Sequence, residues 1–253
     1  NTEFPRAILH VDGDSFFVAC ELTRRPHLKG KPVVTGFERG IATAMSREAK
    51  ALGIHRGMRI REIRRLYPQT AILPSDYRMY SLYAQRMYSI VRQYAKAVEE
   101  YSIDECFADL TGLAEEKGTT YEAIARAIQA DLHLSLGVTF SVGLGVNKST
   151  AKIASKWNKP AGVTVMPQGK IREFLQELAI GKVWGIGRST TLMLGKLGVK
   201  TALDLADKDR AWIAQHCDQP VAEIYEEFQG AFVKGFDEGG DPSSIQPTRT
   251  FHP

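Results

Sequence analysis

Cysteine is scarce in this sequence, and long apolar runs are missing from it. Three cysteines occur among 253 residues, at Cys20, Cys106 and Cys217, and no two of them form a Cys-x-x-Cys pair. An odd number of widely separated cysteines indicates neither a disulfide framework nor a zinc site. No stretch has the pattern of a transmembrane helix or a signal peptide. These absences predict a cytoplasmic protein without a membrane partner.

The excess of basic over acidic residues is small. Lysine and arginine number 33 and aspartate and glutamate 29, which does not by itself indicate a polyanionic partner. Residues 47–67 contain seven basic and two acidic side chains, residues 146–172 six basic and none acidic, and residues 97–110 five acidic and none basic. Each run alone is also explained as a solvated surface. Two basic regions around one acidic centre are typical of a metal enzyme that binds a polyanion.

The order of apolar strands and amphipathic helices predicts an α+β fold. A strand ending in acids comes first, followed after an insertion by a long helix, a strand pair, a second helix and a fourth strand. These elements are expected at residues 6–14, 77–97, 98–103 with 106–110, 120–137 and 138–145. The order β-α-β-β-α-β is that of a ferredoxin-like sheet, in which the first strand lies beside the hairpin of the strand pair. Asp12 and Asp14 should therefore lie close to the acids of that hairpin.

The rest of the sequence is divided by changes of composition. A basic helix is expected at residues 147–159 and a further strand at residues 162–166. From Pro167 onward short helices alternate with glycine turns, and we place a domain boundary there. Residues 237–253 are rich in glycine, proline and serine, which predicts a linker leading toward a domain that this chain lacks.

The segment YSIDECFADL, residues 101–110, places Asp104 and Glu105 side by side among apolar residues. Adjacent carboxylates repel one another and resist burial, so positive charge has to offset them. With Asp12 they form a set of oxygen ligands without histidine or cysteine, which favours Mg²⁺ or Mn²⁺ over zinc or copper. Three carboxylates can hold two such ions about 3.5–4 Å apart, the arrangement used in phosphoryl transfer by polymerases and nucleases.

Six motifs occur in a fixed order along the chain. They are HVDGDSFFVACE (10–21), EAKALGIHRGM (48–58), YSIDECFADLTG (101–112), SVGLGVNKSTAKIAS (141–155), NKPAG (158–162) and VWGIG (183–187). Together they resemble the Y-family of translesion DNA polymerases over essentially the whole chain. Within that family their wording is most similar to the polymerase V and polymerase IV groups. The resemblance implies palm, fingers and thumb without the family's little-finger domain.

The resemblance also implies metal-binding roles. Asp12 and Asp104 would contact both Mg²⁺ ions, and Glu105 would hold the ion that activates the primer 3′-hydroxyl. The backbone carbonyl of Gly13 would complete the shell of the nucleotide-side ion, and Mn²⁺ could replace Mg²⁺. Asp14 matches a frequent acid of the family and is expected to support the site without binding metal.

Nucleotide contacts are implied in the same way. Phe17 takes the position of the steric gate, a ring that excludes a 2′-hydroxyl, and Phe16 lies beneath the nucleotide; both are also explained as core aromatics. Relatives often have YEAR where this chain has REAK, so Arg47 and Lys50 would bind the triphosphate, although lysine lacks the bidentate fork of arginine. Lys159 would be the third phosphate ligand. The alternative for Arg47 and Lys50 is a role as surface cations.

Residues 183–199, VWGIGRSTTLMLGKLGV, have the spacing of a helix-hairpin-helix. Gly185 and Gly187 permit a tight turn that presents backbone N–H groups to a DNA phosphate. Contacts of this kind position a duplex without reading its bases, which suits a polymerase.

The sequence thus predicts the core of a low-fidelity, template-directed DNA polymerase that joins a dNTP to a primer 3′-hydroxyl and releases pyrophosphate. The palm is expected at residues 1–18 and 75–166, the fingers at 19–74 and an all-α thumb at 167–236. The expected partners are primer–template DNA and an incoming dNTP, and in a bacterium the protein would associate with the nucleoid. A sliding clamp, bound through a segment outside this chain, is left open.

Two other functions are weighed against this one. A non-catalytic DNA-binding paralogue of the same fold would be expected to lack the acids, whereas Asp12, Asp104 and Glu105 are all present. A nucleotide cyclase could use a similar palm with two metal ions, but it has no use for a helix-hairpin-helix.

Overall fold

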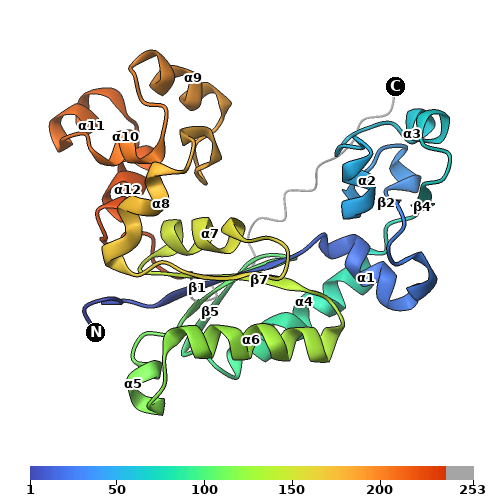
Figure 1. The fold of residues 1–253 in the computed structure, drawn as a ribbon, viewed down its shortest axis with the longest axis horizontal. Coiled ribbons are helices and arrows are strands. Elements are labelled where there is room, and N and C mark those ends of the chain that lie inside the picture. Colours follow the sequence, from blue (N-terminus) through green and yellow to red (C-terminus); the bar gives the residue numbers. More distant parts are fainter. Residues whose placement is uncertain (238–253) are drawn as a thin grey trace.

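The computed structural model describes residues 1–237, so the expected linker at 237–253 lies outside the described residues except for Asp237. At its centre is a five-stranded sheet with α4 and α6 on one face and α7 on the other (Figure 1). The elements of this central unit are β1 (Ile8–Gly13), α1 (Phe16–Arg24), α4 (Tyr77–Arg92), β5 (Ala97–Ser102), β6 (Glu105–Asp109), α5 (Leu113–Lys117), α6 (Tyr121–Leu136), β7 (Phe140–Gly145), α7 (Lys148–Trp157) and β8 (Val163–Val165). None of the helices described is long and apolar enough to cross a membrane.

The strands follow the order β5-β6-β1-β7-β8. β1 is antiparallel to β6 and to β7, and β8 is parallel to β7. The first four strands therefore have the ferredoxin-like order that the sequence predicts, and the strand expected after α7 adds a fifth at the edge. The long helix is shorter than the predicted residues 77–97, because α4 ends at Arg92 and β5 already begins at Ala97.

β1 is buried along its whole length because it lies in the middle of the sheet. α4 and α6 cover one face with side chains at helical spacing, among them Tyr80 and Met87 on α4 and Ile124 and Ile128 on α6. All four side chains belong to one continuous core that extends along the sheet. The tyrosine-rich α4 is therefore a core helix.

The opposite face is covered by α7, which lies unusually close to β7. A Cβ atom at Gly143 would overlap the backbone of α7 at Ala151 and Ser155, so only glycine fits there. The helix begins with a reciprocal cap, in which the Asn147 side chain accepts from the N–H of Thr150 and the Thr150 side chain accepts from the N–H of Asn147. Because α7 lies directly on the sheet, its side chains reach the ends of β1 and β6.

Two lobes extend from the ends of the sheet, both on the side covered by α7 (Figure 1). The inserted lobe, residues 26–74, consists of η1 (Pro26–Leu28), β2 (Val33–Thr35), η2 (Phe37–Arg39), β3 (Ala44–Met45), α2 (Arg47–Ala51), α3 (Ile60–Leu66) and β4 (Ala71–Leu73). The C-terminal lobe, residues 168–237, consists of η3 (Gln168–Lys170), α8 (Ile171–Gln176), η4 (Ile180–Lys182), α9 (Arg188–Lys196), α10 (Ala202–Ala206), α11 (Arg210–His216) and α12 (Gln219–Phe228). α1 runs through the boundary expected between residues 18 and 19.

Glu227 of α12 fastens the C-terminal lobe to α7. Its side chain is fully buried and accepts hydrogen bonds from the N–H and hydroxyl of Ser149, at 3.0 and 2.7 Å, and from the N–H groups of Val233 and Lys234, both at 3.1 Å. Four donors satisfy a carboxylate that would otherwise be costly to bury. The contact also places negative charge at the N-terminus of α7, where the helix dipole favours it.

Gly143→Ala should lower the free energy of unfolding by about 1–3 kcal/mol, because the added methyl group has to displace the backbone of α7. Gly195→Ala is the matched control, since a Cβ atom there meets nothing within 4 Å and alanine favours the helix α9. Urea unfolding followed by circular dichroism measures both variants. Equal stability of the two would contradict the close contact between α7 and β7.

Candidate active site

Four carboxylates gather where β1 ends and β6 begins. Asp12 and Glu105 are direct partners in the antiparallel register of the two strands, and Asp104 lies in the turn before β6. The N–H of Gly13 donates to the carbonyl oxygen of Asp104 at 2.9 Å, which closes this end of the sheet. Asp14 follows in the turn between β1 and α1. The strand order thus places side by side the acids that the sequence separates by about ninety positions.

Lys159, in the loop after α7, supplies positive charge to the acids of β1. Its Nζ lies 3.1 Å from Oδ2 of Asp12 and 3.5 Å from Oδ1 of Asp14. The carbonyl oxygen of Gly13 accepts a hydrogen bond from the same ammonium at 3.4 Å. The Lys159 side chain is 33% exposed, so a ligand at the surface can still reach it.

Asp14 holds the loop that carries Lys159. Its carboxylate accepts hydrogen bonds from the hydroxyls of Thr139 and Ser141, at 2.9 and 2.6 Å, and from the N–H of Ala161 at 2.8 Å. These contacts join the turn after β1 to β7 and to the loop beyond α7. Asp14 therefore holds the loop of Lys159 in place and lies close to the Lys159 ammonium itself.

Glu105 is held by three side chains that sequence reasoning missed. Nε2 of His10 lies 2.9 Å and Nζ of Lys152 3.1 Å from Oε1 of Glu105, while the hydroxyl of Ser102 donates to Oε2 at 3.2 Å. His10 stands two residues before Asp12 on β1, and this spacing places both side chains on one face of the strand. That spacing was the available signal for His10.

Two of the six basic residues at 146–172 are buried, although their charges suggest an exposed surface. Lys148 and Lys152 are each 5% exposed and lie four residues apart on the face of α7 that meets the sheet. They form ion pairs with Glu99 and Glu105. The acidic centre is therefore offset in part by the chain's own lysines.

Burial and crowding raise the pKa of two of the acids. Burial, with the charges of Glu105 and Asp104 nearby, raises the pKa of Asp12 to about 6, against the opposing effect of Lys159. Burial likewise raises the pKa of Asp104, whose Oδ1 accepts a hydrogen bond from Ser102 at 2.9 Å. Both carboxylates are thus held in an environment that disfavours their charge and that a bound cation would relieve.

The environment of Glu105 acts in the other direction. Burial would raise the pKa of Glu105, but the hydrogen bond from His10 and the charge of Lys152 outweigh burial and lower it. Burial lowers the pKa of His10 to about 4, so its imidazole is neutral at pH 7. Because the ionised carboxylate only accepts, the proton of His10 is assigned to Nε2. Nδ1 then accepts from the hydroxyl of Ser155, 2.5 Å away.

These residues fit a divalent cation. A carboxylate oxygen of Asp12 and the carbonyl oxygen of Gly13 already converge on one cation, the ammonium of Lys159. Ligand atoms of His10, Asp12 and Glu105 also lie within 4.8 Å of one another. Because oxygen donors predominate and the imidazole N–H is directed at Glu105, the set suits Mg²⁺ or Mn²⁺.

Phe16 and Phe17 begin α1 and differ in burial. Phe16 is 3% exposed and packs in the core. Phe17 is partly exposed, and its ring stacks on Tyr80 of α4 with the centroids 4.5 Å apart and the planes inclined by 15°. Tyr77 approaches Phe17 edge-on at 5.6 Å. Phe17 thus presents a fixed ring at the edge of the core, whereas Phe16 is a core aromatic.

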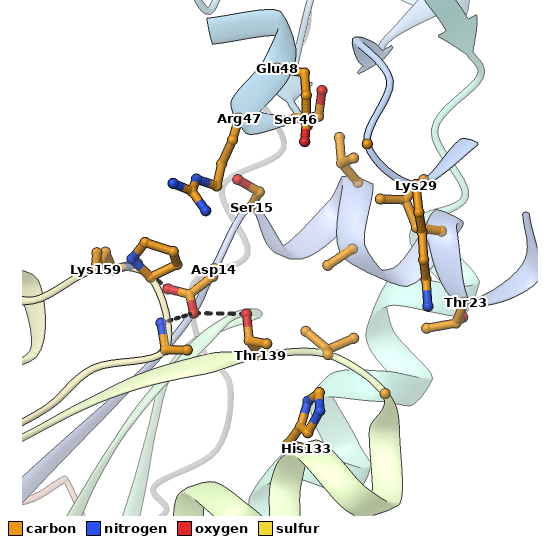
Figure 2. A pocket seen from close by; sticks show the side chains of 18 of the residues that line it. Asp14, Ser15, Thr23, Lys29, Ser46, Arg47, Glu48, His133, Thr139 and Lys159 are labelled. Carbon is orange, nitrogen blue, oxygen red and sulfur yellow. Dashed lines mark hydrogen bonds and ion pairs between the residues drawn. The ribbon is translucent and has the colours of Figure 1, made fainter. Parts of the chain in front are cut away.

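A cavity of about 680 Å³ lies between the inserted lobe, α1 and the loops that precede β7 and follow α7. Arg47 and Lys50 of α2 line it, as does Lys159 from the loop after α7. Figure 2 shows Arg47 extending from α2 toward the turn of Asp14 and Ser15, with Lys159 on the same side of the cavity. The three cations expected to bind a triphosphate therefore surround one cavity beside the acids.

The glycines of the hairpin lie between η4 and α9. Gly185 has a φ of 90°, a conformation that favours glycine, and Gly187 is the residue before α9. A Cβ atom at Gly187 would meet nothing within 4 Å, so the backbone is open there. The element before the hairpin, η4, is a single three-residue 3₁₀ turn, shorter than the helix expected there.

Comparison with known proteins decides the family. A sequence model of the impB/mucB/samB family matches residues 11–156, which include the end of β1, all of β6 and α7 up to Lys156. DNA polymerase IV of Neisseria meningitidis serogroup B is 35% identical over 236 residues, 92% of this chain and 72% of the relative. The chain belongs to this family, the Y-family of DNA polymerases.

Other members of the Y-family match over similar lengths. DNA polymerase IV of Lactococcus lactis subsp. cremoris is 34% identical over 254 residues, 97% of this chain and 69% of the relative. The structure of DinB from Sulfolobus solfataricus superposes with a TM-score of 0.76 at 28% identity, over 88% of this chain and 66% of that one. An insertion ternary complex of Dbh DNA polymerase gives a TM-score of 0.78 at 28% identity, over 88% of this chain and 67% of that one. This Y-family chain thus spans about two thirds of the length of these relatives.

The raised pKa of Asp12 predicts that its charge destabilises the metal-free fold. Its pKa is about 6 in the folded chain against 3.8 for a free side chain, so the folded state binds the proton more tightly and stability falls as the pH rises through that window. Asp12→Asn should therefore raise the free energy of unfolding by about 1–2 kcal/mol near pH 7.5 without divalent cations, and the gain should vanish near pH 4.

Urea unfolding of both chains in EDTA, at the two pH values, measures this difference. Glu122→Gln, an exposed change on α6, is the control and should alter stability little at either pH. A gain from Asp12→Asn that does not depend on pH would contradict the assigned cause.

Proposed function

We propose that this chain is the catalytic core of a translesion DNA polymerase that adds a dNTP to a primer 3′-hydroxyl under the direction of a template, with release of pyrophosphate. The observation that carries the proposal is the pairing of Asp12 with Glu105 across β1 and β6, beside a cavity whose lining includes Arg47, Lys50 and Lys159. Carboxylates that bind divalent cations next to a triphosphate site are the parts that nucleotidyl transfer requires.

Asp12, Asp104, Glu105 and the carbonyl of Gly13 would hold two Mg²⁺ ions, with Mn²⁺ as a substitute. Bound there, the ions would lower the pKa of the primer hydroxyl and neutralise charge on the departing pyrophosphate. The residues themselves supply position: the register of β1 and β6 fixes Asp12 opposite Glu105, and Ser102 orients both Asp104 and Glu105. Little further chemistry is required of the protein.

The incoming nucleotide would lie with its triphosphate in the basic cavity. Arg47, Lys50 and Lys159 would bind phosphate oxygens, and Asp14 would keep the loop of Lys159 in place. Phe17, fixed by its stack on Tyr80, would lie against the sugar and exclude a 2′-hydroxyl. Because Phe16 is buried, it would support the nucleotide site from beneath and would not contact the nucleotide directly.

The sheet with its helices would be the palm, the inserted lobe the fingers and the C-terminal lobe the thumb, with boundaries near residues 18, 75 and 167. The N–H groups at Gly185 and Gly187 would bind phosphates of primer–template DNA. A fingers lobe of about fifty residues cannot form a large closing lid, which supports low fidelity and lesion bypass. The site of action would be the cytoplasm.

Asp104→Asn should reduce the rate of primer extension roughly 100-fold, because it removes a metal-binding charge and keeps the size of the side chain. The assay uses an undamaged primer–template, Mg²⁺ and dNTPs, and the unaltered chain should add one or a few nucleotides in each encounter. Glu116→Gln, at an exposed acid of α5, is the control and should retain full activity. Extension at full rate by Asp104→Asn, or none by the unaltered chain with a little-finger domain supplied, would contradict the proposal.

Phe17→Ala should accept ribonucleotides at least about tenfold more readily relative to deoxynucleotides, because the ring would no longer exclude the 2′-hydroxyl. Single-nucleotide incorporation with matched rNTP and dNTP measures the ratio. Phe37→Ala, at an exposed phenylalanine of the inserted lobe, should leave the ratio unchanged. An unchanged ratio in Phe17→Ala would show that another group selects the sugar.

A further inference from the structure

Lys152 of α7 is a buried lysine whose ammonium is fully engaged. Its side chain is 6% exposed, and Nζ lies 3.1 Å from Oε1 of Glu105. The same ammonium lies 4.5 Å from the ring centroid of Tyr101 and 4.6 Å from that of Trp184. Burial of a lysine is costly unless charge and hydrogen-bonding groups compensate for it, so this arrangement is specific.

The contacts of Lys152 determine which oxygen of Glu105 remains accessible. Oε1 is occupied by Lys152 and by Nε2 of His10, while Oε2 accepts one hydrogen bond from Ser102 at 3.2 Å. Among the ion pairs of residues 1–237, Lys152 is the lysine that contacts Glu105. A carboxylate held through one oxygen presents the other in a defined direction, as partners of metal ligands commonly ensure.

Trp184 connects this pair to the C-terminal lobe. It directly precedes Gly185 of the hairpin, and its indole N–H donates to the hydroxyl of Tyr101 at 3.1 Å. The Trp184 ring is tilted against the ring of Phe107 of β6, with the centroids 5.8 Å apart. Nζ of Lys234, in the segment after α12, lies 4.2 Å from the centroid of the Trp184 ring. Movement of the hairpin relative to the sheet would therefore move the aromatic surface on which Lys152 rests.

We propose that Lys152 is a positioning residue that orients Glu105, and that Trp184 holds Lys152 in place. The position of the C-terminal lobe relative to the sheet then sets the orientation of the Glu105 carboxylate. The consequence for catalysis rests on the proposed function, whereas the coupling between the three side chains does not. The opposing role, a direct contact of Lys152 with DNA phosphate, is disfavoured because its ammonium is buried and already paired.

The cavity beside Lys152 supplies a matched control. Lys156 and Lys182 line the same cavity of about 370 Å³ as Lys152 and Trp184, but both are exposed. Neither forms an ion pair with an acid among the residues that the structure describes. Lys156→Met therefore removes the same charge from the same helix without touching Glu105.

The first test follows Trp184 by fluorescence in a chain in which Trp157→Phe and Trp212→Phe leave it as the sole tryptophan. Mg²⁺ should change the emission of Trp184 along a saturable curve, because a cation bound at Glu105 alters the electrostatic attraction between Glu105 and Lys152. The response should be lost in Lys152→Met and in Glu105→Gln, and kept in Lys156→Met. A flat titration of the parent chain, or an unchanged response in Lys152→Met, would overturn the proposal.

The second test separates turnover from binding. Lys152→Met should lower kcat by roughly 10-fold to 100-fold, while the KM for dNTP and the Kd for DNA stay within about twofold of the parent values. Lys152→Arg should restore much of kcat, and Trp184→Phe should give an intermediate loss. A rise in DNA Kd without a fall in kcat would indicate a DNA contact and overturn the positioning role.

The two tests distinguish this inference from the proposed function. A parent chain that extends no primer but shows the Lys152-dependent response to Mg²⁺ would contradict the polymerase activity and support the coupling. An active parent chain in which Lys152→Met retains full kcat would contradict the positioning role of Lys152 and leave the polymerase activity standing.

Discussion

Repulsion between the carboxylates of Asp12, Asp104 and Glu105 is the constraint around which this molecule is arranged. The register of β1 and β6 places two of them opposite each other, and the turn before β6 adds the third. Such a group is costly in a protein interior unless cations and hydrogen-bond donors lie close by. The elements packed at this end of the sheet can be understood as the means by which that cost is offset.

The positive charge and hydrogen bonds that offset the three carboxylates are divided unequally among them. Glu105 receives a buried lysine and a neutral histidine, which stabilise its charge permanently. Asp12 and Asp104 receive less, and the pKa of each is raised. Lys159 is partly exposed and lies where Asp12 and the Gly13 carbonyl converge, so it can be redirected toward a phosphate. The part of the site around Glu105 is therefore fixed in advance, whereas the part around Asp12 and Asp104 is left to be completed by ligands.

The close contact between α7 and β7 links the fold to this site. Because Gly143 lets the helix lie directly on the sheet, Lys152 reaches Glu105 and Ser155 reaches His10. The N-terminus of the same helix is held by Glu227 from the C-terminal lobe. A single helix thus contacts the acidic cluster through Lys152 and Ser155, and the C-terminal lobe at its N-terminus.

The sequence predicted the strand order, and from it the meeting of Asp12 with Asp104 and Glu105, because local periodicity and a known topology determine both. It also singled out Arg47 and Lys50 of α2 and Lys159 of the loop after α7, which line one cavity in the structure. It did not reveal that Lys148 and Lys152 point inward, since helical spacing shows that they share a face but not which surface that face meets. His10 was missed because a histidine in an apolar strand gives no sign of its partner until the neighbouring strand is in register.

Diffraction from crystals soaked in Mn²⁺ would test the central claim most directly, because anomalous scattering locates the ion without an assay. The account predicts a peak within ligand distance of the Asp12 carboxylate and the Gly13 carbonyl, with Lys159 displaced from its present contacts. It also predicts a peak beside Glu105, which should strengthen when nucleotide and primer–template DNA are present. Fully soaked crystals without manganese at Asp12, or with manganese only at surface acids elsewhere, would contradict the account.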